Sequence, residues 1–232
     1  MNQSEVRYTL DADLKNANIN LIVDGKNMSN ATYQWTLKSP SGAVVLSKKG
    51  KIAQDNFTIS DKLNNISLWW PNGYGKPELY TSLVEVKAAD GSNIGSQTKK
   101  VGFKRSRMVM GDGTWTEPTI FPKSRSVSPA TLEINGKVIF AKGSNWVPNE
   151  LFPGIQNREN YEPYVKWAKE ANFNILRSWG GQVINKESFF DLCDEHGLLV
   201  WQEFPLTGTN YPDDENFLNV LKLESEDRKS VV

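Results

Sequence analysis

The sequence predicts a multi-domain chain of the β plus α/β class, in which a β-sandwich is followed by parallel strands that alternate with helices. Short β-prone runs separated by turn residues fill the first half, which has no helix-length segment with a 3.6-residue apolar period. In the second half, strands that are apolar throughout alternate with amphipathic helices, a pattern typical of parallel βα units. The 232 residues are enough for two ordinary domains.

The composition is that of a globular protein, with 38% hydrophobic and 23% charged residues. The 27 basic and 27 acidic residues cancel, so neither nucleic acid nor an anionic membrane is expected as a partner. There is no apolar run of about twenty residues and no signal-peptide pattern, so the sequence predicts no membrane span and indicates no compartment. A single cysteine excludes an internal disulfide, and we expect neither a metal site nor a cofactor.

Residues 1–108 are expected to form an immunoglobulin-like β-sandwich. Turn pairs such as Asp24-Gly25 and Asp90-Gly91 separate about seven β-prone runs, at the roughly 8–12-residue spacing of that architecture. The runs cover residues 6–10, 18–23, 32–37, 44–46, 56–59, 79–87 and 97–103.

The loop at residues 68–80 contains two adjacent indoles, Trp69 and Trp70, together with two prolines and two glycines. Such a loop is rigid, and its indoles either lock it onto the next domain or face a ligand. We expect the structural role. The total of eight tryptophans leaves the same choice open, because both large cores and carbohydrate clefts use indoles.

The second half begins with a linker or crossing segment at residues 109–130, which is rich in Gly, Pro, Ser and Thr. Asn135-Gly136 then predicts a type I′ hairpin, whose second strand continues toward Trp146 as the first core strand. Further strands are expected at residues 175–179 and 198–204, and helices at 161–171, 186–196 and 213–229.

Each expected helix has an apolar face. Gly197 should end the second helix. The apolar positions are Tyr161, Tyr164, Val165, Trp167 and Ala168 in the first helix, Phe189, Phe190, Leu192 and Cys193 in the second, and Phe217, Val220, Leu221 and Leu223 in the third.

The candidate site lies where the three parallel strands end, since the carboxyl ends of such strands meet at one edge. An arginine inside a buried strand is costly unless a carboxylate or a ligand meets it, and a tryptophan at the strand end offers a flat apolar face. The six residues expected on this rim are Asn145, Trp146, Arg177, Trp179, Gln202 and Glu203. Plain core packing is the alternative role for Asn145, Trp146 and Trp179.

Several stretches in a fixed order carry a resemblance to a known family: residues 134–148, 174–181, 189–197 and 200–204, preceded by the loop at 70–80 and the segment at 101–104. Together they resemble the β-mannosidases of glycoside hydrolase family 2. The β-mannosidase branch depends mainly on the Arg-x-Trp-Gly-Gly form at residues 177–181.

The resemblance implies a retaining exo-glycosidase that acts on terminal β-D-mannosides, with an immunoglobulin-like domain followed by a TIM barrel. Residues 131–232 would then be about three βα units of an incomplete (β/α)8 barrel. The family's two catalytic glutamates follow strands four and seven, so the acid/base and the nucleophile are expected beyond the chain end, and this fragment alone is expected to be inactive. For Arg177 the resemblance implies a hydrogen bond to the nucleophile, and for Trp179 contact with the mannose.

The carboxylates of Glu150 and Glu203 resemble catalytic carboxylates but are not expected to act as the catalytic pair. Asn149-Glu150 resembles the family's acid/base dipeptide but follows the first strand, and Glu203 is a lone carboxylate where the mechanism needs two. Other readings remain open: a family 2 β-glucosaminidase, β-galactosidase or β-glucuronidase, or a non-catalytic carbohydrate-binding or interaction module. Because an incomplete barrel leaves strand edges unpaired, we also expect self-association, or partial unfolding after about Pro129.

Overall fold

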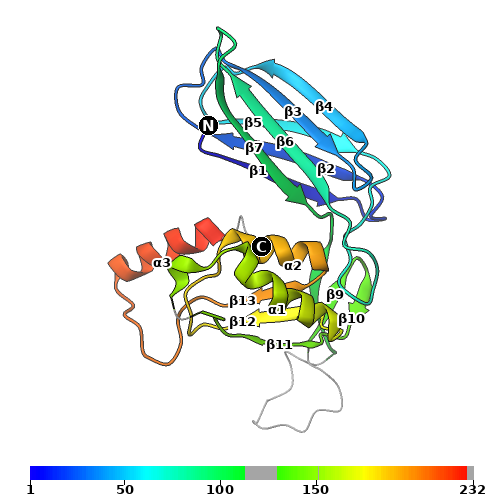
Figure 1. Ribbon diagram of the computed structural model, residues 1–232, viewed down its shortest axis with the longest axis vertical. Helices are drawn as coiled ribbons and strands as arrows, with labels where there is room; N and C mark the ends of the chain where they lie inside the picture. The colour runs from blue at the N-terminus through cyan, green and yellow to red at the C-terminus, as the bar shows by residue number, and fades with distance from the viewer. Residues whose placement is uncertain (113–129, 151, 229–232) are drawn as a thin grey trace.

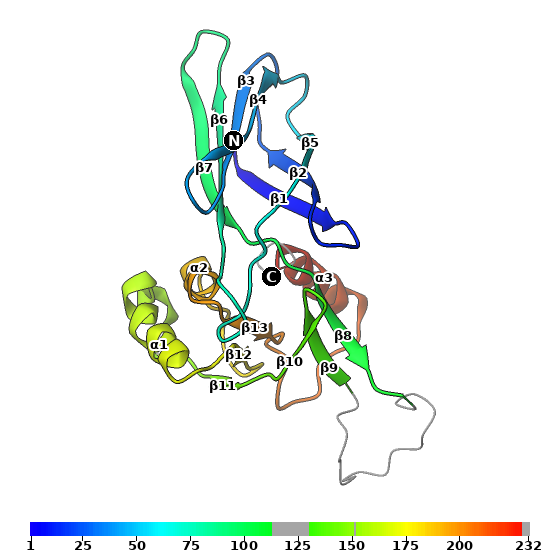
Figure 2. The same cartoon turned by 90° about the vertical axis from the view of Figure 1, so that its right-hand side faces the viewer.

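The computed structural model describes residues 1–112, 130–150 and 152–228. A β-sandwich occupies one end of the molecule and an α/β unit the other (Figure 1). Figure 2 shows the same arrangement from the side, with α2 between the sandwich and the parallel sheet. A β-sandwich followed by an α/β unit agrees with the fold class predicted from the sequence.

The sandwich consists of two antiparallel sheets, ordered β1-β2-β5 and β4-β3-β6-β7. Inward and outward side chains alternate along β2, whose Ala17, Ile19, Leu21 and Val23 are buried. The strands are β1 (Gln3–Leu10), β2 (Ala17–Asp24), β3 (Thr32–Lys38), β4 (Val44–Lys51), β5 (Phe57–Leu63), β6 (Tyr80–Lys87) and β7 (Asn93–Val101). Every run predicted in this half is a strand, so the sandwich prediction is confirmed.

Strand ends differ from the prediction where pairing continues beyond the apolar residues. β4 was expected to end at Leu46, yet it pairs with β3 as far as Lys51. The lysines of this extension are polar residues on a sheet surface, and their backbone still completes the ladder.

A third antiparallel sheet links the two halves. It has the order β10-β9-β8, with β8 at Ser106–Met110, β9 at Ala130–Ile134 and β10 at Lys137–Ile139. Asn135 and Gly136 have φ values of 52° and 80°, as a type I′ turn requires. The expected division between residues 108 and 109 falls inside β8, which belongs with this hairpin because it pairs with β9. Most of the expected linker, residues 113–129, lies outside the described residues.

The α/β unit has a parallel sheet ordered β11-β12-β13, formed by Gly143–Trp146, Ile175–Ser178 and Leu199–Gln202. Helices α1 (Arg158–Glu170) and α2 (Glu187–His196) pack against it, and a short 3-10 turn, η1 (Pro153–Ile155), precedes α1. The core between helices and sheet contains Tyr161, Val165, Leu176, Phe189 and Leu192.

Helix α2 begins at Glu187, one residue later than predicted, and its other predicted features are confirmed. Phe189, Phe190, Leu192 and Cys193 are buried, and Gly197 ends the helix with a φ of 74°. Helix α1 begins three residues earlier than residue 161, because Asn157 caps it: the Asn160 backbone N–H donates to Asn157 Oδ1 at 3.0 Å, and the Asn157 N–H donates to Asn160 Oδ1 at 3.1 Å.

Two expected apolar faces are only partly covered. Tyr164 and Trp167 of α1 are exposed, Trp167 to 61%. Helix α3 (Glu215–Arg228) has exposed Val220 and Leu223 where an apolar stripe was expected. None of the helices in the described ranges is both long enough and apolar enough to cross a membrane.

The loop between β5 and β6 joins the sandwich to the helices. Buried Trp69 donates from Nε1 to the Asp194 carbonyl at 2.8 Å. Asn72 donates from Nδ2 to the carbonyls of Lys169 and Phe173 at 3.0 and 2.9 Å, and its backbone N–H donates to the Gly197 carbonyl at 2.7 Å. Carbonyls at a helix C-terminus lack partners within the helix, so this loop supplies donors at the ends of α1 and α2. The structural role expected for Trp69 is confirmed.

Candidate functional site

The candidate site lies at the carboxyl edge of the parallel sheet, on the face away from α1 and α2. Asn145, Arg177 and Trp201 occupy the same level of β11, β12 and β13, so their side chains share one face. Their neighbours Trp146, Ser178 and Gln202 occupy the next level and point to the opposite face.

Arg177 is the centre of a polar cluster. Its Nε donates to Glu203 Oε1 at 2.7 Å, and its Nη2 lies 2.6 Å from the same oxygen. Nη1 donates to Asn145 Oδ1 at 2.9 Å. Glu203 Oε2 accepts the Gly180 backbone N–H at 3.0 Å. A carboxylate or a ligand was expected to meet this arginine, and the structure has a carboxylate there, that of Glu203.

Trp201 belongs to the same face and was missed in the sequence. The Arg177 guanidinium carbon lies 5.7 Å from the centre of the Trp201 ring, and this indole is 55% exposed. Trp201 precedes Glu203 by two residues, and residues two apart in a strand share a face. This spacing is the signal that could have identified it.

Trp179 leads the loop that follows β12, and its indole lies over Gly181. A Cβ on Gly181 would be 2.3 Å from Trp179 Cη2, and a Cβ on Gly180 would be 2.7 Å from the Phe204 carbonyl oxygen. Both positions therefore need glycine for steric reasons. Within the described chain, the Trp179 indole N–H is buried and has no hydrogen-bond partner.

Trp146 and Gln202 do not share this site, so their expected place on the rim is wrong. Trp146 is only 7% exposed, and the centre of its ring lies 4.6 Å from the centre of the Phe189 ring. Its Nε1 donates to Asn185 Oδ1 at 3.1 Å. The Gln202 amide Nε2 donates to the Glu203 carbonyl at 2.6 Å. The reason is the alternation of side chains along a strand, which separates neighbouring residues onto opposite faces.

The Asn149-Glu150 pair lies on the approach to α1 and supports it locally. Asn149 Nδ2 donates to the Asn160 carbonyl at 3.0 Å, and Asn149 Oδ1 accepts from Gln156 Nε2 at 2.8 Å. Glu150 Oε1 accepts the Phe152 N–H at 3.3 Å. These contacts give the pair a structural role.

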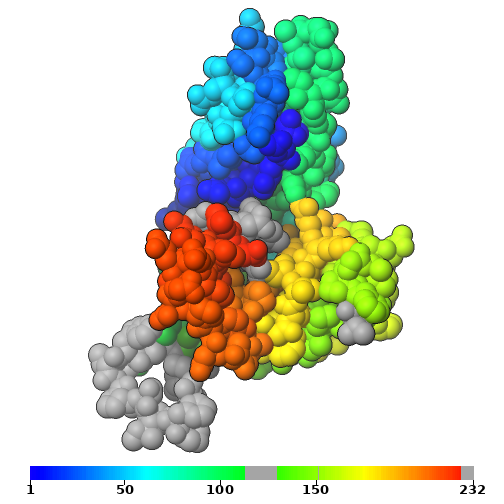
Figure 3. Space-filling model, turned by 90° about the vertical axis from the view of Figure 1, so that its left-hand side faces the viewer, coloured from blue at the N-terminus to red at the C-terminus, as the bar shows by residue number. Residues whose placement is uncertain are grey.

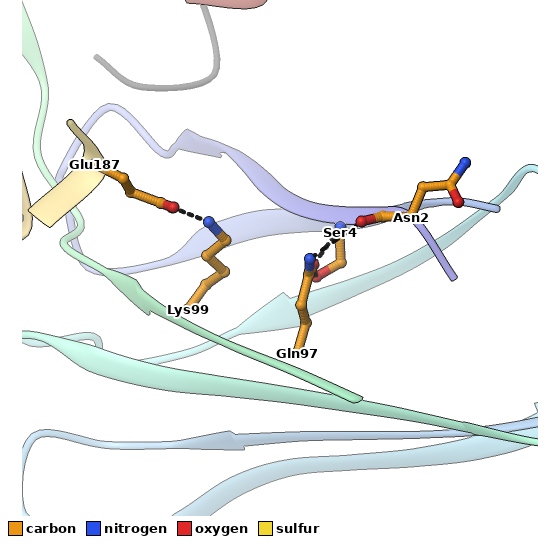
Figure 4. A network of polar contacts seen from close by, with 5 residues as sticks. All are labelled: Asn2, Ser4, Gln97, Lys99 and Glu187. Carbon is orange, nitrogen blue, oxygen red and sulfur yellow. Dashed lines mark hydrogen bonds and ion pairs between the residues drawn. The ribbon is translucent and has the colours of Figure 1, made fainter. Parts of the chain in front are cut away.

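A cavity lies elsewhere, between the sandwich and α2. It has a volume of about 720 Å³ and is lined by residues of β1, β7 and α2, with Gln202 at one side and Glu224 of α3 at another. Figure 3 shows α3 approaching β1 on this face. In Figure 4, Ser4 donates from its N–H and its hydroxyl to Gln97 Oε1, at 2.5 and 2.7 Å, and Lys99 pairs with Glu187. The polar groups in Figure 4 form hydrogen bonds and an ion pair with one another, which is a structural role. We therefore assign the candidate site to the carboxyl edge of the parallel sheet and not to this cavity.

Asp191 and Asp194 of α2 line this cavity and lie away from the carboxyl edge. Burial raises the pKa of Asp194 and of Asp191, and it raises the pKa of the Cys193 thiol well above its usual value. Burial lowers the pKa of His196 at the helix end. Among the described residues, no three His, Cys, Asp or Glu side chains come together as metal ligands would.

A sandwich joined to parallel βα units, with an arginine–carboxylate cluster at the carboxyl edge, defines a multi-domain α/β class of protein. Residues 2–104 match the family model described as glycosyl hydrolases family 2. Beta-mannosidase B of Aspergillus oryzae is 33% identical over 199 residues, which are 82% of this chain and 22% of that protein. The β-mannosidase of Capra hircus is 32% identical over 171 residues, 72% of this chain and 18% of that protein.

Solved structures agree. The crystal structure of a β-D-mannosidase from Dictyoglomus thermophilum matches 100% of this chain and 27% of its own, with a TM-score of 0.79 and 28% identity. A β-glucuronidase from Parabacteroides merdae shares the fold, with a TM-score of 0.72 at 19% identity over 92% of this chain and 25% of its own. The chain belongs to glycoside hydrolase family 2. It spans about a fifth of the length of the curated relatives it matches, 22% and 18% for the two above.

Proposed function

We propose that this chain is the immunoglobulin-like domain and the first part of the catalytic barrel of a retaining exo-β-mannosidase. The observation that carries the proposal is the cluster of Arg177, Glu203 and Asn145 beside Trp179, at the edge where barrel enzymes build their active sites. The β-mannosidases among the relatives support the substrate class.

The barrel assignment is supported by strand order. Three parallel strands that are adjacent in the order of the sequence, with helices on one face, are how a (β/α)8 barrel begins. In the proposed division, the sandwich is residues 1–108, the crossing segment 109–130 and the barrel part 131–232. The pairing of β8 with β9, together with a family match that ends at residue 104, supports ending the sandwich at about residue 104 instead of 108.

We assign the site roles as follows. The Trp179 indole contacts the mannose ring, because it lies where the chain leaves the sheet. Arg177 orients a carboxylate or a sugar oxygen through its partly exposed guanidinium. Asn145 and Glu203 hold Arg177 in place. Trp146 and Gln202 support the site from the opposite face and do not contact sugar.

Glu203 is not a member of the catalytic pair in this proposal, because Arg177 and Gly180 already occupy its oxygens. A retaining glycosidase needs two carboxyl groups about 5–5.5 Å apart. We propose that sequence beyond these 232 residues supplies both. The chain alone then binds a β-mannoside without hydrolysing it.

Aryl β-mannosides test this proposal in two proteins: the 232-residue chain, and the whole enzyme whose reading frame contains it. We expect turnover only in the whole enzyme, and turnover by the chain alone would overturn the inactivity claim. In the whole enzyme, Arg177→Lys should lower kcat/KM by on the order of 10²-fold, because lysine cannot make the forked contact. Arg107→Lys is the matched control, since Arg107 pairs with Glu133 away from the site.

A substrate panel distinguishes the related activities. Aryl β-glucuronide, β-galactoside and β-glucosaminide are assayed beside the β-mannoside. A higher kcat/KM on any of these three would replace the β-mannosidase assignment by that activity, and the family membership would stand.

A further inference from the structure

A chain of buried and half-buried polar side chains holds the loop that begins with Trp179. Ser178 is 0% exposed, and its Oγ accepts from Asn185 Nδ2 at 3.1 Å and from Gln182 Nε2. Asn185 Oδ1 in turn accepts from Trp146 Nε1 at 3.1 Å. Buried polar groups that lose their partners cost free energy, so these bonds favour one loop conformation.

The opposite face of β12 holds the same loop. Glu203 Oε2 accepts the Gly180 N–H at 3.0 Å while Oε1 binds Arg177. Arg177 and Ser178 are neighbours in the strand and point to opposite faces, so the loop is fastened on both sides of the sheet.

Trp179 lies in the chain between Ser178 and Gly180, which are hydrogen-bonded on opposite faces of the sheet. Its indole covers Gly181, where even a methyl group would overlap the six-membered ring. The conformation of the loop at residues 180–182 therefore determines where the indole can lie over Gly181.

We propose that Ser178, Gln182 and Asn185 are positioning residues that hold the Trp179 indole in its place at the carboxyl edge. The sugar-binding consequence rests on the function proposed above. None of the three contacts the sugar. They act by fixing the loop, and the interaction with Trp146 extends this network into the hydrophobic core.

The position of Trp179 is measured without any sugar, from the indole N–H resonances of protein labelled with ¹⁵N-tryptophan. Trp179→Phe identifies its signal among those of the eight tryptophans. Ser178→Ala and Gln182→Met should shift this signal and speed its hydrogen exchange by about tenfold, because the loop loses hydrogen bonds. Asn185→Asp, which keeps an oxygen for Trp146 but loses the amide donor, should act in the same direction.

Val183→Ala is the matched control, since Val183 is an exposed residue of the same loop. It should leave the Trp179 signal unchanged. Ser178→Thr, which keeps the hydroxyl, should restore the signal toward that of the unchanged protein. Gln182→Met nearly preserves side-chain volume, so it remains informative if Ser178→Ala fails to fold.

Sugar binding is then measured by titrating methyl β-D-mannoside, and in the whole enzyme by kinetics. We expect KM to rise by about five- to tenfold with kcat nearly unchanged, because contact with the indole is made in the ground state as well as the transition state. An unmoved Trp179 signal in Ser178→Ala and Gln182→Met would overturn the positioning role even if mannoside binds. A moved signal with no mannoside binding in any protein would support the positioning role and overturn the proposed function.

Discussion

Glu203 is the residue on which the carboxyl-edge cluster depends, because it accepts from both Arg177 and the Gly180 backbone. Glu203→Ala should lower the free energy of unfolding by about 1–2 kcal/mol, since both donors lose their acceptor. Partial exposure of the pair keeps the loss small. Urea denaturation measures the effect, with Glu170→Ala on the exposed face of α1 as control. An unchanged midpoint in Glu203→Ala would contradict this account of the cluster.

Asp194 makes stability depend on pH. Burial raises the pKa of its carboxyl, Lys104 opposes that rise, and Asp191 and Glu195 add to it. The folded state then holds the proton more tightly than the unfolded state does, so stability falls as pH rises from the ordinary carboxyl pKa through the raised one. Asp194→Asn should flatten this decline, which begins as pH rises above the ordinary carboxyl pKa of about 4.

The measurement for Asp194 is the free energy of unfolding from urea titrations at several pH values. Asp213→Asn, at an exposed position, serves as the control and should keep the slope of the unchanged protein. A slope that Asp194→Asn leaves unaltered would show that this carboxyl is not the cause.

The sequence predicted the partner of a side chain where that partner follows from the side chain's own chemistry. It failed to predict the face of the sheet to which a side chain points, because that face depends on alternation along the strand. The cost of burying an arginine pointed to a carboxylate partner for Arg177, and Glu203 fills that place. Trp146 and Gln202 were misplaced because the prediction grouped strand ends by position and ignored alternation. The same error concealed Trp201, which is in phase with Glu203.

At the scale of elements, the Asn157–Asn160 capping box decides where α1 begins. Asn157→Ala should cost about 1 kcal/mol of stability, because the first turn loses an acceptor for the Asn160 N–H. Asn157→Ser keeps an acceptor and should cost only a few tenths of that amount. Urea unfolding followed by circular dichroism compares them, and equal midpoints for Ala and Ser would rule out the cap.

The loop containing Asn72 is the second element whose effect is measurable. Asn72→Ala removes the side-chain donor for the Lys169 and Phe173 carbonyls, so we expect a loss of about 1–3 kcal/mol. Hydrogen exchange should report it as faster opening at the C-terminal turn of α1, with β2 and β3 unaffected. Asn64→Ala, at an exposed position, is the control. Uniform protection in Asn72→Ala would contradict a local role.

Elements with a local signal were predictable, and elements defined by distant partners were not. A few adjacent residues determine both the end of α2 at Gly197 and its apolar face. β8 was missed because its partner β9 lies beyond residues 113–129, so no nearby pattern marks it as a strand. The apolar residues of α3 predicted a packed stripe, but burial depends on a neighbour that a helical period does not specify.

At the scale of the whole molecule, the parallel sheet should make the chain self-associate. β11 and β13 each pair on one side only within the described residues. Phe140, Val147 and Trp201 are exposed near that sheet. Open strand edges beside apolar side chains favour pairing between chains.

Sedimentation velocity over a range of concentrations measures this association. Trp201→Lys should reduce it, because it places a charge on the exposed face of the sheet. Trp167→Lys is the matched control, since Trp167 is also an exposed tryptophan but belongs to helix α1 and not to a strand. A monodisperse monomer with one cooperative melting transition would contradict the prediction.

The contacts of Trp69 and Asn72 also bear on the order of events during synthesis. They join residues separated by 125, 97 and 101 positions, and the sandwich side is made first. The nascent chain thus presents the donors of the loop before the carbonyls of α1 and α2 leave the ribosome. We therefore expect each helix end to stay frayed until it contacts the folded sandwich. The sandwich, folded first, then supplies the hydrogen-bond donors that stabilise the helices of the following domain as they fold.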